Sequence, residues 1–264
     1  ITTFMETSGN FDNRQAGFRS DHRTTDNIFI FRTLIKKFKQ KKKKLYTCFV
    51  DFSKAFDTVW RDGLLYKIHQ NGIKGRIFNL IHNMYSDVSY VVKTQEGVTD
   101  SIQSSVGVKQ GCVCSPTLFN IYLNNLKDYL EPNRDHAPLL DEQPLTHLLF
   151  ADDLVLLSNS AKGLQKNIES LQRFTQDWKM KVNLSKTKVV IFGDTTGHSD
   201  YMFNINDTNI AICDSYTYLG VVLHRNGTFK LAIQTLKGKA MRAWFKLIHS
   251  RSEEHTSELQ SRSD

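Results

Sequence analysis

Residues 145–158 read LTHLLFADDLVLLS, in which two β-prone apolar runs flank a pair of carboxylates. The runs, at 145–150 and 154–158, have the length of strands, and a short polar break between such runs is typical of a hairpin. The pattern therefore predicts an antiparallel hairpin with Asp152 and Asp153 at its tip. Carboxylates set in apolar strands are costly unless a positive charge compensates them, and a bound cation would do so.

A third carboxylate, Asp51, belongs to another apolar run, Tyr46 to Phe52. A strand there would carry Asp51 to a strand end. Three carboxylates at two strand ends could hold two Mg²⁺ ions, because hard divalent cations prefer oxygen ligands. Two such ions about 4 Å apart can activate a hydroxyl and stabilise the leaving oxygen of a phosphoryl transfer. The alternative is a salt bridge to Lys or Arg, which this basic chain could supply.

Outside these runs, the sequence alternates helices with short strands. Helical spacing and capping signals predict helices at 25–39, 61–70, 75–85, from Ser115-Pro116 onward and at 164–178, with Ser115 as an N-cap. β-prone runs predict a hairpin of 88–94 with 101–108, and a strand at 188–192. This irregular alternation predicts an α+β domain whose antiparallel sheet is covered on one side by helices.

The charge balance is basic. Lys and Arg number 35 against 27 Asp and Glu, which gives a net charge of +8 at pH 7. Such a balance favours polyanionic partners, either nucleic acid or an anionic membrane surface. No apolar run approaches the roughly 20 residues that a membrane helix needs, so we expect no membrane partner and a protein inside the cell. The cysteines lack the spacing of common zinc sites and are expected to be reduced thiols: Cys48, Cys112, Cys114 and Cys213.

A lysine run, Lys41 to Lys44, follows the first predicted helix. Positive charge complements a helix C-terminus, so we interpret the run as stabilising that helix. Nuclear targeting and phosphate contact are the alternatives.

The last fourteen residues, 251–264, read RSEEHTSELQSRSD and abandon the preceding pattern. They contain almost no apolar residue and resemble the translation of a sequencing adapter. We exclude them from the fold as an extraneous tail and expect them to be disordered or unattached to the core.

Several segments together carry a resemblance that no single one would establish. They read QAGFR at 15–19, FVDFSKAFDTV at 49–59, GVKQGCVCSP at 107–116, FADD at 150–153, NLSKTK at 183–188 and YLGV at 218–221. In order and spacing they resemble the successive motifs of reverse transcriptases from non-LTR (LINE-type) retrotransposons. Cys114 stands where that family usually has a leucine.

This resemblance implies a fold and an activity. The fold would be a right-hand polymerase palm, an antiparallel sheet backed by helices, with partial fingers over residues 1–228 and only the start of a thumb over 229–250. The activity would be that of a nucleotidyltransferase, an RNA-directed DNA polymerase that adds dNTPs to a DNA primer on an RNA template. Such a protein would work in the cytoplasm and nucleus as a retroelement ribonucleoprotein. The family's more N-terminal finger motifs and its endonuclease would lie outside this chain.

The resemblance also assigns metal ligands. Asp51 and Asp152 would be the principal ligands of two Mg²⁺ ions, and Asp153 the supporting carboxylate. We therefore expect the three to converge in space.

Further roles follow at the substrate. Phe56 would lie under the sugar of the incoming nucleotide and exclude a 2′-hydroxyl. Gln110 and Gly111 would lie against the nascent base pair, and Lys186 would protonate the departing pyrophosphate. Asp57 would be structural.

Three alternatives remain open from the sequence. A catalytically inactive nucleic-acid-binding fragment would keep the same motifs. A group II intron maturase-type reverse transcriptase has related ones. A nucleotidyl cyclase could share the palm, although the contexts of Phe56 and of Gln110-Gly111 argue against it.

Overall fold

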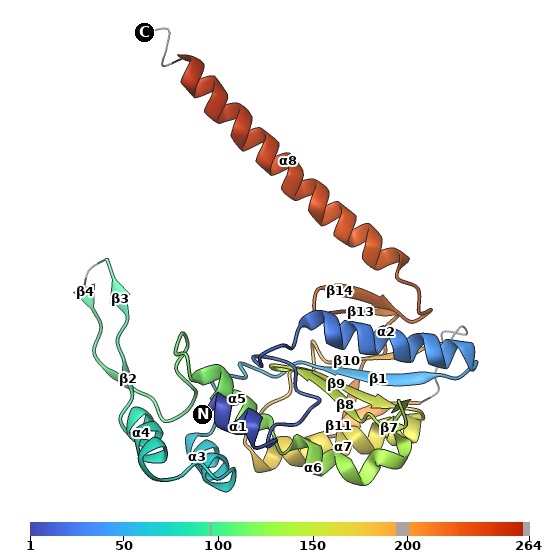
Figure 1. The fold of residues 1–264 in the computed structure, drawn as a ribbon, viewed down its shortest axis with the longest axis horizontal. Helices are drawn as coiled ribbons and strands as arrows, with labels where there is room; N and C mark the ends of the chain where they lie inside the picture. Colours follow the sequence, from blue (N-terminus) through green and yellow to red (C-terminus); the bar gives the residue numbers. More distant parts are fainter. Residues whose placement is uncertain (96, 194–200, 261–264) are drawn as a thin grey trace.

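The fold centres on a four-stranded antiparallel sheet with the strand order β10-β1-β9-β8 (Figure 1). The computed structural model describes residues 1–95, 97–193 and 201–260, with side chains of the last helix to residue 248. The strands are β1 (Leu45–Val50), β8 (His147–Phe150), β9 (Asp153–Ser158) and β10 (Lys188–Phe192). Strand β1 pairs with both β9 and β10. The predicted hairpin and the strands predicted near 46–52 and at 188–192 are confirmed.

Helices cover both faces of this sheet, so the prediction of a one-sided cover was wrong. On β1, Cys48 and Val50 belong to one buried cluster and Leu45 and Phe49 to the other. The first cluster is completed by α5 (Ser115–Leu123), α6 (Leu126–Leu130) and α7 (Ala161–Asp177). The second is completed by α2 (Thr24–Gln40) and the hairpin of β13 (Ser215–Tyr218) with β14 (Val221–His224). The sequence did contain a signal for this two-sided burial. The apolar run of β9 is unbroken, which is typical of a strand buried on both faces.

Aromatic packing joins α2 to the sheet. The ring of Phe31 lies 5.7 Å from that of Phe49, 5.4 Å from Phe192 and 6.0 Å from Tyr218, measured between centroids. All four side chains are buried. Truncating such a residue to Ala typically costs about 3–5 kcal/mol, so this cluster fixes α2 on the sheet.

The other predicted helices are also present, with one difference at a cap. They are α3 (Arg61–Gln70) and α4 (Gly75–Ser86), and a short α1 (Thr2–Thr7) precedes them. At α5 the N-cap is Cys114, so Ser115 is the first helical residue and not the cap. Its hydroxyl instead donates to the carbonyl of Lys109 at 2.6 Å, because the chain turns back there toward the preceding loop.

Several short pairs of strands lie around the core. The predicted hairpin around Gly97 is confirmed as two successive pairs, β2 (Ser89–Tyr90) with β5 (Ile102–Gln103) and β3 (Lys93–Thr94) with β4 (Gly97–Val98), and it projects from the body (Figure 1). The polar segment before β8 forms a 3-10 helix (Glu131–His136) and the pair β6 (Leu139–Leu140) with β7 (Gln143–Pro144). Beside α7 lies the pair β11 (Phe203–Ile205) with β12 (Thr208–Ile210).

The last helix, α8 (Lys230–Gln260), projects away from the sheet (Figure 1). It runs through position 251 without a break as far as Gln260, while residues 261–264 lie outside the described ones. Its far end stands clear of the core, as expected of an unattached tail (Figure 1). Within the described residues, no helix is both long and apolar enough to cross a membrane. All four cysteines are free thiols, as predicted.

Candidate active site

The carboxylates meet at one end of the sheet. The register of β1 with β9 ends at Val50 opposite Leu154, and one further step places Asp51 opposite Asp153. Asp153 also begins β9 opposite Phe150 of β8, with Asp152 just before it in the turn. Residues about one hundred positions apart in the sequence thus lie side by side.

The backbone of Asp51 is anchored on both sides. Its N–H donates to the hydroxyl of Thr187 at 3.2 Å, and its carbonyl accepts from the N–H of Asn183 at 2.7 Å. Both partners belong to the segment that leads into β10. Because that segment also carries Lys186, the amine of Lys186 lies 4.0 Å from the nearer carboxylate oxygen of Asp51. The side chain of Lys186 is 68% exposed and that of Asp51 is 31% exposed, so both remain open to a ligand.

A buried glutamine holds the turn that carries the other two carboxylates. Ala151 has a left-handed backbone, with φ at +58°, which costs a non-glycine residue about 1–2 kcal/mol. The amide of Gln15 donates to the carbonyl of Ala151 at 3.1 Å and accepts from its N–H at 3.0 Å. The same oxygen accepts from the N–H of Gly17 at 2.8 Å. Gln15 therefore fixes a strained turn from across the fold.

Gly17 allows this approach because it has no side chain. A Cβ added there would lie 2.0 Å from the nitrogen of Ala151, which no real structure tolerates. The carbonyl of Gly17 accepts from the buried amide of Asn120 at 2.7 Å. Backbone therefore packs directly on backbone beneath the carboxylate turn.

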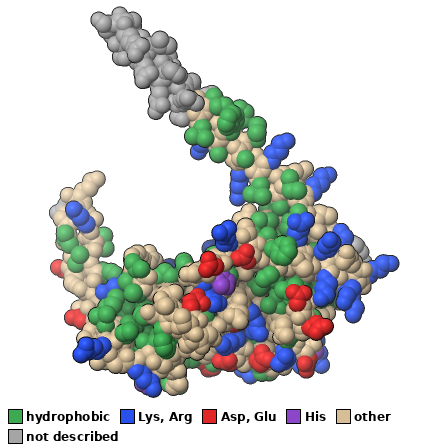
Figure 2. All heavy atoms as spheres, viewed as in Figure 1, with side chains coloured by type: hydrophobic (Ala, Val, Ile, Leu, Met, Phe, Trp, Pro, Cys, Tyr) green, Lys and Arg blue, Asp and Glu red, His purple; other side chains and the backbone are tan. Residues whose placement is uncertain are grey.

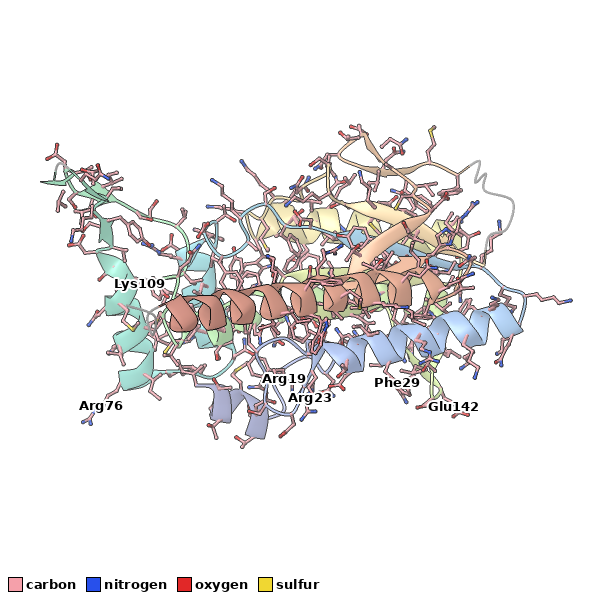
Figure 3. The ribbon with its side chains drawn as sticks, turned by 90° about the horizontal axis from the view of Figure 1, so that it is seen from above. Arg19, Arg23, Phe29, Arg76, Lys109 and Glu142 are labelled. Carbon is pink, nitrogen blue, oxygen red and sulfur yellow. The ribbon has the colours of Figure 1, made fainter. Side chains whose placement is uncertain are left out.

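Arg19 holds the segment that contains Gln15 and Gly17. Its guanidinium makes two bonds to Glu6, at 2.9 and 2.6 Å, and donates to the carbonyls of Asp12 and Gln15. Arg19 and Arg23 lie in the loop between α1 and α2 (Figure 3). Because every one of these bonds is internal, Arg19 is a structural residue of this loop.

Negative charge accumulates where the strands end. Burial, then the charges of Asp152 and Asp51, raise the pKa of Asp153 above its ordinary value. Burial, followed by the charges of Asp153 and Asp51, also raises the pKa of Tyr216. The ring of Tyr216 stacks on Phe49, with centroids 4.4 Å apart and planes 13° apart. These carboxylates repel one another, and a cation would relieve that repulsion.

The donor set suits a hard divalent cation, but its side chains are not gathered around one point. Over the described residues, no three His, Cys, Asp or Glu side chains are placed so that they could hold a metal ion. The carboxylates share one strand edge, so side-chain rotation is the change that a metal would require.

Phe56 lies in a short aromatic stack next to the carboxylate turn. Its ring stacks on Phe119 at 4.2 Å, with planes 19° apart, and meets the edge of Phe18 at 6.0 Å. Phe18 follows Gly17 directly, so the stack adjoins Ala151. Phe56 is half-buried, which leaves part of the ring open.

The loop with Gln110 and Gly111 lies beside Phe56. The carbonyl of Phe56 accepts from the N–H of Val108 at 2.9 Å. The amide of Gln110 donates to the carboxylate of Asp57 at 2.7 Å, consistent with a structural Asp57. Gly111 has φ at +79°, a conformation open to glycine, and nothing lies within 4 Å of the place where a side chain would be.

Arg61 anchors this loop from below. It is buried and donates to the carbonyls of Gly107 at 2.9 Å and Val106 at 2.8 Å, while its guanidinium lies 5.4 Å from the centre of the Tyr85 ring. Among the described residues, the hydrogen-bond partners of this buried cation are neutral groups, which is unusual. It also bonds the carbonyl of Ser104, so it holds three carbonyls of the loop.

A comparison with protein families shows which family has this arrangement of residues. The family described as "Reverse transcriptase (RNA-dependent DNA polymerase)" matches residues 1–223. The chain belongs to the reverse transcriptase family. The resemblance drawn from the motifs is therefore confirmed.

The relatives of this reverse transcriptase chain come from mobile elements. It is 29% identical over 244 residues to the RNA-directed DNA polymerase from mobile element jockey of Drosophila funebris, covering 90% of the chain and 26% of the relative. It is 26% identical over 234 residues to the Pol polyprotein from type-1 retrotransposable element R2 of Nasonia vitripennis, covering 85% and 23%. The chain thus spans about a quarter of the length of these relatives.

A solved structure has a similar fold. Telomerase from Candida tropicalis, in complex with a TWJ fragment of telomeric RNA, aligns with a TM-score of 0.60 and 16% identity, over 85% of this chain and 35% of that one. At this identity the similarity concerns the fold alone.

The structure sorts the residues expected in a reverse transcriptase site into two groups. Asp51, Asp152, Asp153 and Lys186 lie at the strand ends, and Phe56 lies with Gln110 and Gly111 at the neighbouring loop. The sequence missed the supporting residues Gln15, Arg61 and Tyr216. Gln15 was visible only as part of a motif, because a contact across 136 positions leaves no local signal.

Proposed function

We propose that this chain is the catalytic part of an RNA-directed DNA polymerase, the reverse transcriptase of a non-LTR retrotransposon. The observation that carries the proposal is the position of Asp51 directly after Val50, which pairs with Leu154 next to Asp153 and Asp152, in a chain of this family. In the proposed reaction the 3′-hydroxyl of a DNA primer attacks the α-phosphate of a dNTP. A new P–O bond forms and pyrophosphate leaves.

The fold supports a division into palm, partial fingers and thumb. The central sheet with α5, α6 and α7 would be the palm, and the projecting hairpin with α3 and α4 part of the fingers, all within residues 1–228. Residues 229–250 of α8 would begin the thumb. The surface is hollowed between the projecting hairpin and α8 (Figure 2), which suits a bound template and primer.

Asp51 and Asp152 would be the principal ligands of two Mg²⁺ ions, with Asp153 in support. When bound, such ions lower the charge barrier at the attacking hydroxyl and at the leaving pyrophosphate. The anchored backbone of Asp51 and the clamped turn at Ala151 would keep the strand ends in place, so that only the carboxylate side chains need to rotate. The raised pKa of Asp153 supports this, because burial and the neighbouring carboxylates both disfavour its charge, and a bound cation would offset them.

Lys186 would act as the acid for pyrophosphate. Its amine lies 4.0 Å from Asp51 and is well exposed, so it can reach a polyphosphate bound beside that carboxylate. A cation in this place also offsets the charge that develops on the leaving group.

Phe56 would exclude the 2′-hydroxyl of an rNTP. Contacts with Phe119 and Phe18 fix the position of the Phe56 ring. A fixed ring cannot move aside to make room for an extra hydroxyl. Gln110 and Gly111 would face the nascent base pair. Since one amide N–H of Gln110 is engaged with Asp57, the amide oxygen and the second N–H are left for the base.

Primer extension on an RNA template tests the proposal. Asp152→Asn keeps the shape of the side chain but removes its charge, so extension should fall by at least about a thousandfold, the equivalent of losing roughly 4 kcal/mol of transition-state stabilisation. RNA binding should persist, because Lys and Arg carry most of it. Asp207→Asn, at an exposed turn, is the matched control and should extend like the parent.

The second candidate is a nucleic-acid-binding fragment without turnover. A parent chain that binds RNA but extends no primer would favour it. Equal extension by the parent and Asp152→Asn would refute the assignment of the carboxylates.

A further inference from the structure

The opposite end of β1 from Asp51 is densely basic. Residues 36–44 read KKFKQKKKK, with seven lysines among nine positions, and residues 27–50 contain no Asp or Glu. Lys and Arg side chains gather where α2 ends and β1 begins (Figures 1 and 2). Since β1 has six residues at about 3.3 Å each, this end lies roughly 20 Å from the carboxylates.

Stabilisation of the α2 C-terminus accounts for only part of this charge. Lys37 and Lys39 lie in the last turn of the helix, where a cation interacts favourably with the helix dipole. Lys41 is the C-cap of the helix, Lys42 and Lys43 lie beyond it, and all three are exposed. The charges of Lys42 and Lys43 lie further from the helix end, so the run carries more positive charge than the last turn alone can use.

The lysines are held in a folded corner. Lys42 has φ at +51°, and the N–H of Lys43 donates to the carbonyl of Phe38 at 2.9 Å, which turns the chain into β1. The amine of Lys37 donates to the carbonyl of Leu139 at 2.9 Å, and that of Lys39 to the carbonyl of Asn226 at 3.2 Å. A receptor that reads a lysine run as an extended peptide would have to undo these bonds.

The corner also encloses a hollow. A pocket of about 160 Å³ lies against three of the lysines. It is lined by Lys37, Lys41, Lys43, Phe38, residues 137–139 and Asn159. Cations beside an aromatic ring and an amide suit a phosphate with its attached sugar better than they suit a purely apolar ligand.

We propose that this lysine corner, residues 36–44 with the hollow beside them, binds the sugar-phosphate backbone of RNA outside the active site. The inference rests on the proposed function in one respect. RNA is taken as the source because the template of the proposed reaction is RNA and extends beyond the few nucleotides that an active site holds. Contacts through lysine are independent of base sequence, so the corner would hold whichever part of the template reaches it.

The test is fluorescence anisotropy of a labelled single-stranded RNA across a salt series, without dNTPs or divalent cations. Each lysine–phosphate contact contributes about −0.7 to the slope of log K against log salt on a single strand. Lys41→Gln combined with Lys43→Gln should therefore make the slope less negative by about 1.4 and weaken binding at least roughly fivefold at low salt. The matched control is Lys162→Gln with Lys166→Gln, two exposed lysines of α7, and it should change neither. Lys41→Arg with Lys43→Arg keeps the charge and should bind like the parent.

A slope equal to that of the control would overturn the proposal. Unchanged RNA affinity combined with lost binding to a purified nuclear-import receptor would assign the lysines to a protein partner and also overturn it. The rate of chemical acetylation of Lys41 and Lys43 shows whether RNA or DNA covers them. A primed template with an RNA overhang should slow the acetylation. Slower acetylation with a DNA overhang alone would contradict RNA as the ligand. Because the assay needs no turnover, Asp152→Asn should leave the slope unchanged even if the catalytic proposal fails.

Discussion

The two ends of β1 use charge in opposite ways. At one end, acidic side chains stand on a backbone fixed by buried contacts from Gln15, Gly17 and Thr187. At the other, lysines stand exposed on a turn and act, in our proposal, as independent contacts. At the acidic end the exact position of each side chain matters, whereas at the basic end the number of lysines matters. Single substitutions should therefore have large effects among the supports of the carboxylates and graded effects among the lysines.

After the substitution of a carboxylate itself, the largest effect is expected at Gln15, which touches no substrate in our account. Gln15→Leu keeps the size of the side chain but leaves the N–H and carbonyl of Ala151 without their partners, so the turn should lose its geometry. Extension should fall at least about 100-fold, since small misplacements of catalytic groups have effects of that order, and the free energy of unfolding should fall by about 1–3 kcal/mol. Primer extension and denaturant unfolding measure the two.

Gln70→Leu, at an exposed position of α3, is the control for Gln15 and should alter neither quantity. A positioning role further requires that the loss appear in kcat with little change in the KM for dNTP. If Gln15→Leu lowered stability but left kcat intact, the turn would not depend on the clamp.

A smaller effect, on selectivity, is expected at Phe56. Phe56→Val should raise rNTP use relative to dNTP use, because the smaller side chain leaves room for a 2′-hydroxyl. The ratio of the two kcat/KM values measures this. A core role alone would depress both substrates alike, so an unchanged ratio would remove Phe56 from the site and weaken the contrast between the two ends of β1.

The smallest effect is expected at Asp153, where a substitution should raise the stability of the fold instead of lowering it. Its raised pKa means that the folded protein holds this proton more tightly than the unfolded chain, so stability falls as the pH rises from the ordinary value of 3.8 through the raised one. Asp153→Asn should therefore raise the Tm at pH 7 without divalent cations and give no advantage below pH 3.8. Thermal melts at several pH values, with Asp207→Asn as control, measure it. A lower Tm for Asp153→Asn at pH 7 would show that neither burial nor repulsion makes the charge of Asp153 destabilising there.

The sequence predicted much of this arrangement because the signals were local. The apolar runs around Asp152 and before Asp51 are strand signals, and the motif resemblance supplied the roles. The sequence failed where contacts are distant: nothing near Gln15 indicates that its amide clamps Ala151, and nothing near Arg61 indicates the loop that it holds. The second cover of the sheet was missed for a different reason: the unbroken apolar run of β9 indicates burial on both faces, but helices were expected on one side only.

The central claim is that the carboxylate end of the sheet is a polymerase active site, and incorporation of a single dNTP on a primed RNA template tests it most directly. Asp51→Asn should reduce the single-turnover rate by at least about a thousandfold with RNA affinity unchanged, because the lost charge acts on the transferred phosphate and not on template binding. Incorporation by Asp51→Asn at the rate of the parent would contradict the account.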